Sequence, residues 1–243
     1  MFHPDGPSLR ELAEQALSST DRGYDLIASK FDHTPFRTPD VLLERAASIA
    51  ERGGTVERGI DLCCGTGAGL RWFRPLSTEE IVGIDRSRGM LEEARRRSKD
   101  AGGTAAIRFV QGDALSLPFA DGSFGLATCF GAFGHILEHD EPRFVREVAR
   151  VLAPGGRFVF ITSEMPPIYS PSRWIARSFN GVMRVRNALI KPEFIMYYLT
   201  FLLPGARWLC EAMGLDVEVH HGAFERPFKA AKLVVATKPR VRR

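Results

Sequence analysis

The sequence lacks long apolar runs and has few cysteines, and each shortage excludes a class of protein. Its longest apolar stretch, Ile195 to Leu203, is well short of the roughly 20 residues that a membrane-spanning helix needs. The four cysteines form no spaced pairs of the kind that bind zinc, and they suit a reducing compartment. The first residues are polar and proline-rich, unlike a signal peptide. We therefore expect no transmembrane segment, no metal site and a cytoplasmic location.

The chain also lacks a strong excess of charge once its last residues are set apart. It has 33 lysines and arginines against 29 aspartates and glutamates. Four basic residues account for this difference: Lys238, Arg240, Arg242 and Arg243. The remainder is formally neutral, which favours a solvated tail over a nucleic-acid-binding surface. With 243 residues, 44% of them hydrophobic, the chain can bury a core without disulfides or metals.

Short apolar runs alternate with helical patterns from residue 58 onward, which predicts βαβ units and a sheet covered on both faces. The expected strands are 58–64, 80–85, 107–111, 124–130 and 157–162, and helices fit at about 66–74, 87–99 and 141–152. A helix at 205–213 and two runs, 215–221 and 232–238, predict a closing hairpin. Earlier helices are expected at 9–18 and at 39–52, the second with Thr38 as its N-cap. We expect three parts: an N-terminal helical cover (1–57), a sheet domain (58–162 and 204–243) and an inserted helical cap (163–203).

A glycine-rich turn follows the first expected strand, in Gly59-Ile-Asp-Leu-Cys-Cys-Gly-Thr-Gly-Ala-Gly69. Its glycines allow a tight turn and the close approach of a ligand at the carboxyl ends of the strands. A dinucleotide site needs a glycine where Leu70 stands, although Asp85 supplies the acid expected about 20 residues further on. The Asp61 carboxylate would repel a pyrophosphate but suits an ammonium group, and Asp113 can accept a hydrogen bond from an adenine amino group.

With these residues, and with the turn Leu152-Ala-Pro-Gly-Gly156 before the fifth strand, the chain resembles the class I S-adenosylmethionine-dependent methyltransferases. It looks closest to the small-molecule branch that includes the ubiquinone and menaquinone methyltransferases. The resemblance covers about 59–162 strongly, and 204–238 fits the family's last helix and hairpin. It implies an α/β fold with a Rossmann-like seven-stranded sheet, mostly parallel with an antiparallel C-terminal hairpin, and S-adenosylmethionine as the cofactor.

The resemblance also implies which residues bind the cofactor. The methionine part would be held by Asp61, Cys63, Gly65 and Gly67, and the ribose by Asp85 with Arg86. The adenine would contact Met90, Asp113 and Ala114. Cys129 and Phe130 would lie near the sulfonium. Cys63 departs from the family, which often has glycine at this position. Tyr24 and Phe31 resemble the N-terminal segment that closes over the cofactor in this family. The alternative for Met90, Cys63 and Cys64 is packing in the core.

His135 is the candidate catalytic base, because it follows the fourth strand on the cleft side and its ordinary pKa suits proton removal near neutrality. The alternative is a polar loop residue at the rim of the cleft. Phe130 and Phe133 would wall an apolar pocket or pack in the core. A base is needed only where the nucleophile is a weak hydroxyl or a carbon acid; methyl transfer itself is expected by direct in-line displacement.

The segment 163–203 interrupts the alternation and is too long for a plain connection. Polar positions at helical spacing define one face: Arg173, Arg177, Asn180, Arg184, Asn187 and Lys191. Apolar residues define the opposite face: Ile175, Phe179, Val182 and Ile190. Such a helix is either a cap with its charges in water or a peripheral membrane contact through 173–191. Residues 196–203 predict an aromatic lid, and hence a small, apolar or aromatic acceptor.

Three other functions stay open from the sequence. An NAD(P)-dependent oxidoreductase would use a similar sheet, and a cofactor-binding protein without catalysis would carry the same loop. A nucleic-acid methyltransferase would carry an Asn-Pro-Pro-Tyr type motif where Cys129-Phe-Gly-Ala stands, so no nucleic-acid partner is expected. The partner is expected to be a small-molecule acceptor, and the chain a monomer or homodimer.

Overall fold

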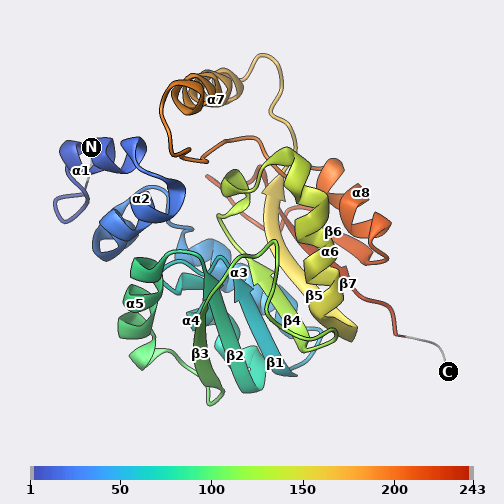
Figure 1. Cartoon of the computed structure of the whole chain (residues 1–243). Coiled ribbons are helices and arrows are strands. Elements are labelled where there is room, and N and C mark those ends of the chain that lie inside the picture. Colours follow the sequence, from blue (N-terminus) through green and yellow to red (C-terminus); the bar gives the residue numbers. More distant parts are fainter. Residues whose placement is uncertain (1–2, 241–243) are drawn as a thin grey trace.

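Seven strands form one sheet, in the order β3-β2-β1-β4-β5-β7-β6, in the computed structural model (Figure 1), which describes residues 3–240. They are β1 (Val56–Leu62), β2 (Ser77–Asp85), β3 (Ala106–Gln111), β4 (Phe124–Cys129), β5 (Leu152–Ser163), β6 (Asp216–His220) and β7 (Ala231–Thr237). Neighbours among the first five strands pair in parallel. The expected fold class is confirmed, because apolar strands between helices can be covered on both faces.

The last strand of the sequence lies inside the sheet. β7 pairs antiparallel with β5 on one side and with β6 on the other. The predicted C-terminal hairpin is therefore present, with β6 as the edge strand. Just beyond β7, Lys238 donates hydrogen bonds of 2.7 Å to the carbonyl oxygens of Ala149 and Leu152. This residue therefore binds the end of a helix and does not belong to a solvated tail. Arg242 and Arg243 lie outside the described residues.

Eight α-helices surround the sheet in the part of the chain from residue 3 to residue 240. They are α1 (Leu9–Leu17), α2 (Thr20–Ile27), α3 (Asp40–Glu51), α4 (Ala68–Phe73), α5 (Arg88–Arg97), α6 (Glu141–Val151), α7 (Pro171–Leu189) and α8 (Gly205–Ala212). Ser8, Ser19 and Ser87 cap α1, α2 and α5. The prediction of Thr38 as an N-cap is wrong: Pro39 occupies that position and no side chain caps α3.

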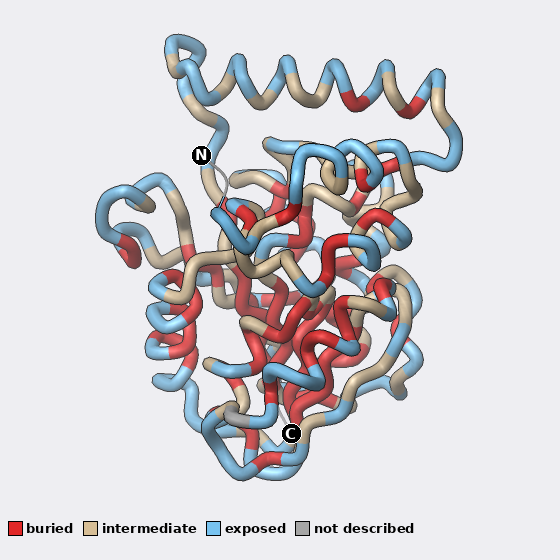
Figure 2. Tube along the Cα trace, turned by 90° about the vertical axis from the view of Figure 1, so that its left-hand side faces the viewer, coloured by how far each residue is buried: buried red, intermediate tan, exposed pale blue. Residues whose placement is uncertain are grey.

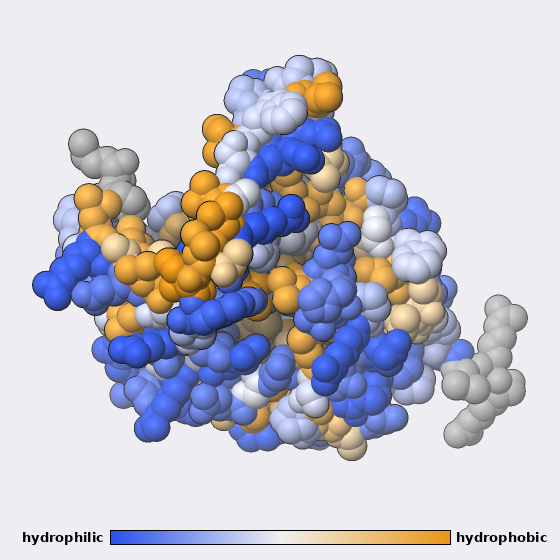
Figure 3. All heavy atoms as spheres, turned by 45° about the horizontal axis from the view of Figure 1, so that its top comes forward, coloured by the Kyte–Doolittle hydropathy of each residue, from blue (hydrophilic) through white to orange (hydrophobic). Residues whose placement is uncertain are grey.

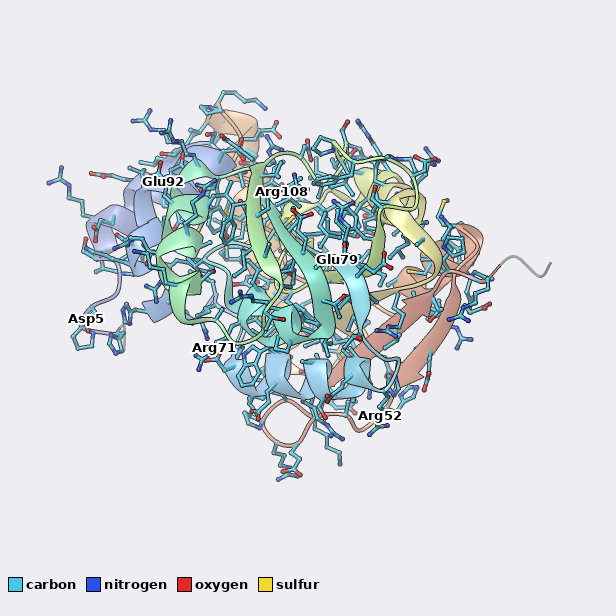
Figure 4. The ribbon with its side chains drawn as sticks, turned by 90° about the horizontal axis from the view of Figure 1, so that it is seen from below. Asp5, Arg52, Arg71, Glu79, Glu92 and Arg108 are labelled. Atoms are coloured by element: carbon cyan, nitrogen blue, oxygen red, sulfur yellow. The ribbon has the colours of Figure 1, made fainter. Side chains whose placement is uncertain are left out.

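Two hydrophobic cores lie on the two faces of the sheet. One contains Leu42 of α3, Leu70 and Phe73 of α4 and Leu91 of α5. The other contains residues of α6 and α8, such as Phe144 and Leu209. In Figure 4, seen from below, the strands run between these layers, and charged side chains such as that of Glu92 on α5 point outward. This packing holds the carboxyl ends of β1, β2 and β4 rigidly at one end of the molecule.

The helix α7 lies across that same end, beyond the strands, and Figure 2 shows it as a single long helix with almost no buried residues. Only Met183 and Asn187 are buried along it. Two residues of its expected apolar face, Ile175 and Val182, are 70% and 65% exposed. The division of the chain into a cover, a sheet domain and an inserted cap stays a prediction.

Candidate active site

A cavity of about 650 Å³ lies at the carboxyl ends of the parallel strands. Most of the residues predicted to form the site line it: Tyr24, Asp61, Cys63, Gly65, Asp85, Arg86, Met90, Asp113, Ala114, Phe130 and His135. Two predicted residues do not line it. Gly67 is the N-cap of α4, and an added Cβ there would meet Ala94 and Ser98. Cys129 is completely buried at the end of β4.

The glycine-rich turn uses backbone conformations that most residues avoid. Gly65 has a φ of +53° and Gly67 a φ of +85°. Cys63 has a φ of +51°, in the left-handed region that favours glycine. This conformation gives a physical reason for the family's preference for glycine where this chain has cysteine. The turn also has no room for a side chain at Gly69, because an added Cβ would lie 2.6 Å from Asp61 Oδ2.

Asp61, next to the last residue of β1, is a buried carboxylate at the wall of the cavity. Its Oδ1 accepts a hydrogen bond of 2.6 Å from Thr128 Oγ1, and no lysine, arginine or histidine of the described residues pairs with it. Burial raises the pKa of Asp61 to about 7, and the nearby charge of Asp85 adds to this effect. An uncompensated carboxylate in a cavity suits a cationic group such as an ammonium.

Asp85 ends β2 and joins two loops. Its Oδ2 accepts a hydrogen bond of 2.9 Å from the backbone N–H of Gly65, and its Oδ1 accepts one of 2.9 Å from Ser87. Burial raises the pKa of Asp85. A carboxylate oxygen accepts more than one hydrogen bond, so both oxygens can still bind hydroxyl groups in the cavity. The Arg86 guanidinium pairs with Asp21 of α2 at 2.9 Å, which connects this loop to the N-terminal helices.

Arg37 is a candidate site residue that the sequence analysis missed. It lines the cavity, and its buried Nε makes no hydrogen bond among the described residues but lies 3.5 Å from Asp32 Oδ2. Its Nη2 donates to Asp40 Oδ1 at 2.8 Å. Two carboxylates already lie beside this guanidinium, and its place in the cavity wall also allows it to bind a carboxylate group of a ligand. Its position before α3 carries no motif, so the sequence held no signal for this role.

Tyr24 and His135 form a hydrogen-bonded pair in the cavity wall, although they stand far apart in the sequence. Tyr24 Oη lies 2.8 Å from His135 Nε2, and His135 Nδ1 lies 2.6 Å from the carbonyl oxygen of Ile195. A carbonyl only accepts, so we assign the ring proton to Nδ1, which leaves Nε2 as the acceptor for the Tyr24 hydroxyl. Burial lowers the pKa of His135 and raises that of Tyr24, so both groups are neutral near neutral pH.

A strap formed by residues 191–203 closes one side of the cavity. The backbone N–H of Tyr197 donates a hydrogen bond of 2.8 Å to the carbonyl oxygen of Gly134. A Cβ on Gly134 would overlap the carbonyl oxygen of Tyr197, so only glycine fits there. On the other side, the N–H of Ile195 donates to Thr20 Oγ1 at 2.7 Å. The strap therefore joins the loop after β4 to the start of α2.

The part of the cavity under the strap is apolar. Its side chains come from the N-terminal segment, from the loop after β4 and from the strap: Phe31, Phe36, Phe130, Phe133, Met196, Tyr197, Tyr198, Leu199 and Leu202. The ring of Phe133 stacks on Phe201 with centroids 4.4 Å apart. The aromatic lid expected from the sequence thus lines the same cavity as the two buried carboxylates. One cavity can hold a cationic, hydroxyl-bearing ligand and an apolar one together.

The residues present fit S-adenosylmethionine, whose ammonium, carboxylate and ribose hydroxyls each meet a suitable group. Asp61 suits the ammonium, the Arg37 guanidinium suits the carboxylate, and Asp85 suits the ribose hydroxyls. Met90 and Ala114 supply buried apolar surface for a purine ring. We propose these roles for the individual residues.

Comparisons with known proteins agree with this assignment. A family model described as a methyltransferase domain matches residues 60–156. Demethylmenaquinone methyltransferase of Lactococcus lactis is 39% identical over 167 residues, which cover 65% of this chain and 62% of that protein. The corresponding enzyme of Staphylococcus aureus is 34% identical over 211 residues, covering 83% of this chain and 82% of that protein. The match to the Lactococcus protein thus spans less than two thirds of its length.

Solved structures share the fold at low sequence identity. The YcgJ protein of Bacillus subtilis gives a TM-score of 0.58 at 21% identity, with 81% of this chain and 99% of that chain covered. A phosphoethanolamine N-methyltransferase of Haemonchus contortus, in complex with S-adenosylhomocysteine, gives a TM-score of 0.62 at 19% identity over 96% of this chain and 61% of that one.

The sheet order, the glycine-rich turn with its two carboxylates and the identity to these relatives define one class. The chain belongs to the class I S-adenosylmethionine-dependent methyltransferases. Within that class, the relatives named above are demethylmenaquinone methyltransferases. Among the described residues, no helix has the length and apolar character needed to cross a membrane.

Proposed function

We propose that this chain transfers the methyl group of S-adenosylmethionine to a small, apolar acceptor of the quinol type. The observation that carries the proposal is that one cavity is lined both by the carboxylates of Asp61 and Asp85 and by aromatic side chains of the strap and of the loop after β4. Relatives that methylate demethylmenaquinone, according to their names, support the quinone class of acceptor. A hydrophilic amine would gain little from a wall of phenylalanine and tyrosine rings.

The bound cofactor would supply an activated methyl group, and the chain's own residues would position the acceptor. Asp61, Asp85 and Arg37 would hold the cofactor's polar groups on the side of the glycine-rich turn. The rings of Phe133 and Tyr197 would hold the acceptor's ring, which restricts its approach to one direction. Positioning of this kind supplies on the order of 7–11 kcal/mol of a reaction barrier.

The Tyr24–His135 pair would remove the acceptor's proton. The Tyr24 hydroxyl gives its proton to His135 Nε2 while it receives the proton of an acceptor hydroxyl, and His135 becomes an imidazolium. The hydrogen bond from Nδ1 to the carbonyl of Ile195 keeps the ring in the required orientation. Loss of the proton makes the acceptor a stronger nucleophile.

The proposed activity is tested by the formation of S-adenosylhomocysteine from S-adenosylmethionine with a panel of acceptors. A short-chain demethylated naphthoquinol is expected to be turned over, and small hydrophilic amines are not. Turnover of the amines alone would contradict the proposal. A parallel titration with NAD(P) separates the oxidoreductase alternative, which the buried Asp61 carboxylate disfavours because it would repel a pyrophosphate.

Two further expectations belong to this proposal. A cytoplasmic location is supported by the four cysteines, which are all free. A monomeric or homodimeric state is the expectation for the assembly, and sedimentation measurements would distinguish the two.

A further inference from the structure

The outward side of α7 and the loop before it form the largest gathering of exposed apolar side chains on the described residues. Eight of the 14 large hydrophobic residues that are exposed lie here: Met165, Ile168, Tyr169, Trp174, Ile175, Val182, Val185 and Leu189. We call these eight residues the α7 ridge. In Figure 3, in which this end of the molecule is turned forward, orange hydrophobic residues stand out among hydrophilic ones. Large exposed apolar patches mark interaction surfaces.

The α7 ridge stands out by its charge as well. Between Glu164 and Glu193 the chain has no acidic residue but five basic ones. Arg186 is bound to backbone carbonyls, and Lys191 pairs with Glu193. Arg177 and Arg184 make no hydrogen bond or ion pair within residues 3–240. Their helical spacing places them together along one border of the ridge, so a partner with negative charge at its surface is favoured.

The polar residues of α7 explain why its apolar side faces outward. Asn187 binds both backbone groups of Phe194, at 3.0 and 3.1 Å, and Asn180 binds both backbone groups of Tyr198 at 2.8 Å. The two asparagines are seven residues apart, so they lie on the same face of the helix and fix its rotation against the strap. The apolar residues on the far side are therefore held in solvent by specific hydrogen bonds.

We propose that the α7 ridge docks on an anionic lipid bilayer. An amphipathic helix with apolar residues on one side, basic residues at the border and no acids is built to lie in a bilayer interface. At 1.5 Å per residue its 19 residues span about 28 Å, enough for a broad contact. The strap that α7 holds also lines the cavity, so docking would bring the cavity to the bilayer. The benefit to catalysis rests on the proposed function, whereas the docking itself does not.

Vesicle co-sedimentation tests the docking with the intact chain. We expect binding to phosphatidylcholine vesicles that contain phosphatidylglycerol, and much weaker binding to phosphatidylcholine alone or at high salt. The double variant Ile175→Glu/Val182→Glu should bind at least roughly tenfold more weakly, because two apolar contacts are lost. Arg177→Gln/Arg184→Gln should lose about fivefold per charge on the anionic vesicles. Val41→Glu, an exposed apolar position on α3, is the matched control and should bind like the unaltered chain.

The same preparations are assayed with a water-soluble naphthoquinol, for which all these variants should keep their activity, because none of the altered residues lines the cavity. Failure of the unaltered chain to bind anionic vesicles, or equal binding by Ile175→Glu/Val182→Glu, would overturn the docking proposal. The proposal would also be overturned if the unaltered chain formed a dimer without binding vesicles and Ile175→Glu/Val182→Glu dissociated that dimer. The ridge would then bind a second copy of the chain. Vesicle binding without turnover of any quinol would instead overturn the proposed function alone.

Discussion

At the scale of single residues, the site depends on carboxylates held out of water before a ligand arrives. Asp61 is buried without a cationic partner, and Asp85 accepts hydrogen bonds from the backbone N–H groups of Gly65 and Ser87. Both have raised pKa values because burial disfavours their charged forms. A bound cation stabilises the ionised form of Asp61, so binding of a cationic ligand is coupled to the loss of a proton from this carboxyl group.

The binding of S-adenosylmethionine should therefore depend on pH through Asp61. The pKa of this group is raised to about 7, and only its ionised form attracts an ammonium. Affinity should thus rise with pH, to be about tenfold higher at about pH 8 than at about pH 6. Calorimetry in buffers of different ionisation enthalpy would detect the proton released on binding. Asp61→Asn should bind weakly at both values, and an unchanged slope in this variant would contradict the assignment.

Replacement of Asp85 should weaken cofactor binding more generally. Asp85→Ala removes the acceptors for the ribose hydroxyls and the two bonds to the backbone, so we expect a roughly ten- to hundredfold loss of affinity. Titration calorimetry measures the loss, with a melting curve to verify folding. Glu92→Ala on the exposed side of α5 is the control. Tight binding retained by Asp85→Ala would show that the ribose lies elsewhere.

His135 should control the rate and its pH dependence rather than cofactor affinity. Burial lowers its pKa below the ordinary value of 6.5, so the neutral base is present at neutral pH and the rate should fall only as pH drops through the lowered pKa. His135→Gln should reduce kcat by roughly 10²–10⁴. Tyr24→Phe should have a similar effect if its hydroxyl relays the proton. Were His135→Gln to keep both the rate and the acid limb, the residue would only line the rim.

At the scale of elements, α7 shows how side-chain hydrogen bonds override an amphipathic pattern. The spacing of its residues predicted a polar and an apolar face, and Asn180 and Asn187 of the polar face turn the apolar one to solvent by binding the strap. Each asparagine matches both backbone groups of one residue, a pairing that no periodicity analysis can detect. The strap was expected from its aromatic residues, but its attachment to the loop after β4 through Gly134 was not.

Loss of Asn187 should loosen the strap. Asn187→Ala leaves both backbone groups of Phe194 without partners, so we expect the free energy of unfolding to fall by about 1–3 kcal/mol. The KM for the acceptor should rise, while the affinity for S-adenosylmethionine should change little. Urea unfolding and steady-state kinetics measure the two effects. Ser178→Ala, at an exposed position of the same helix, should leave both unchanged.

At the scale of the whole molecule, the cavity joins the two hydrophobic cores. Phe130 packs against the core under α3 and α4, whereas Phe133 belongs to the core under α6 and α8, and both line the cavity. A ligand there contacts both layers and should stabilise the molecule as a unit. At about 100 times its Kd, S-adenosylhomocysteine should add about 2.7 kcal/mol to the free energy of unfolding. Two separate unfolding transitions with only one shifted would contradict this coupling.

The sequence predicted the sheet well, because apolar strands and glycine-rich turns are local signals. The strand ends at Asp61 and Asp85 could be located from those signals, and a cofactor site followed from the family resemblance. Arg37 could not be found, since only the packed structure places its guanidinium in the wall of the cavity. The pairing of Tyr24 with His135 likewise joins residues 111 positions apart, beyond the reach of any local pattern.

The place of β7 has a consequence for the way the chain reaches its final form. This strand lies between β5 and β6, so those two strands have no partner on their facing edges until β7 arrives. On the ribosome, β7 is made after every other strand. The sheet can therefore close only after the last of its seven strands has been made, and until then two open strand edges must be kept from pairing with neighbouring chains.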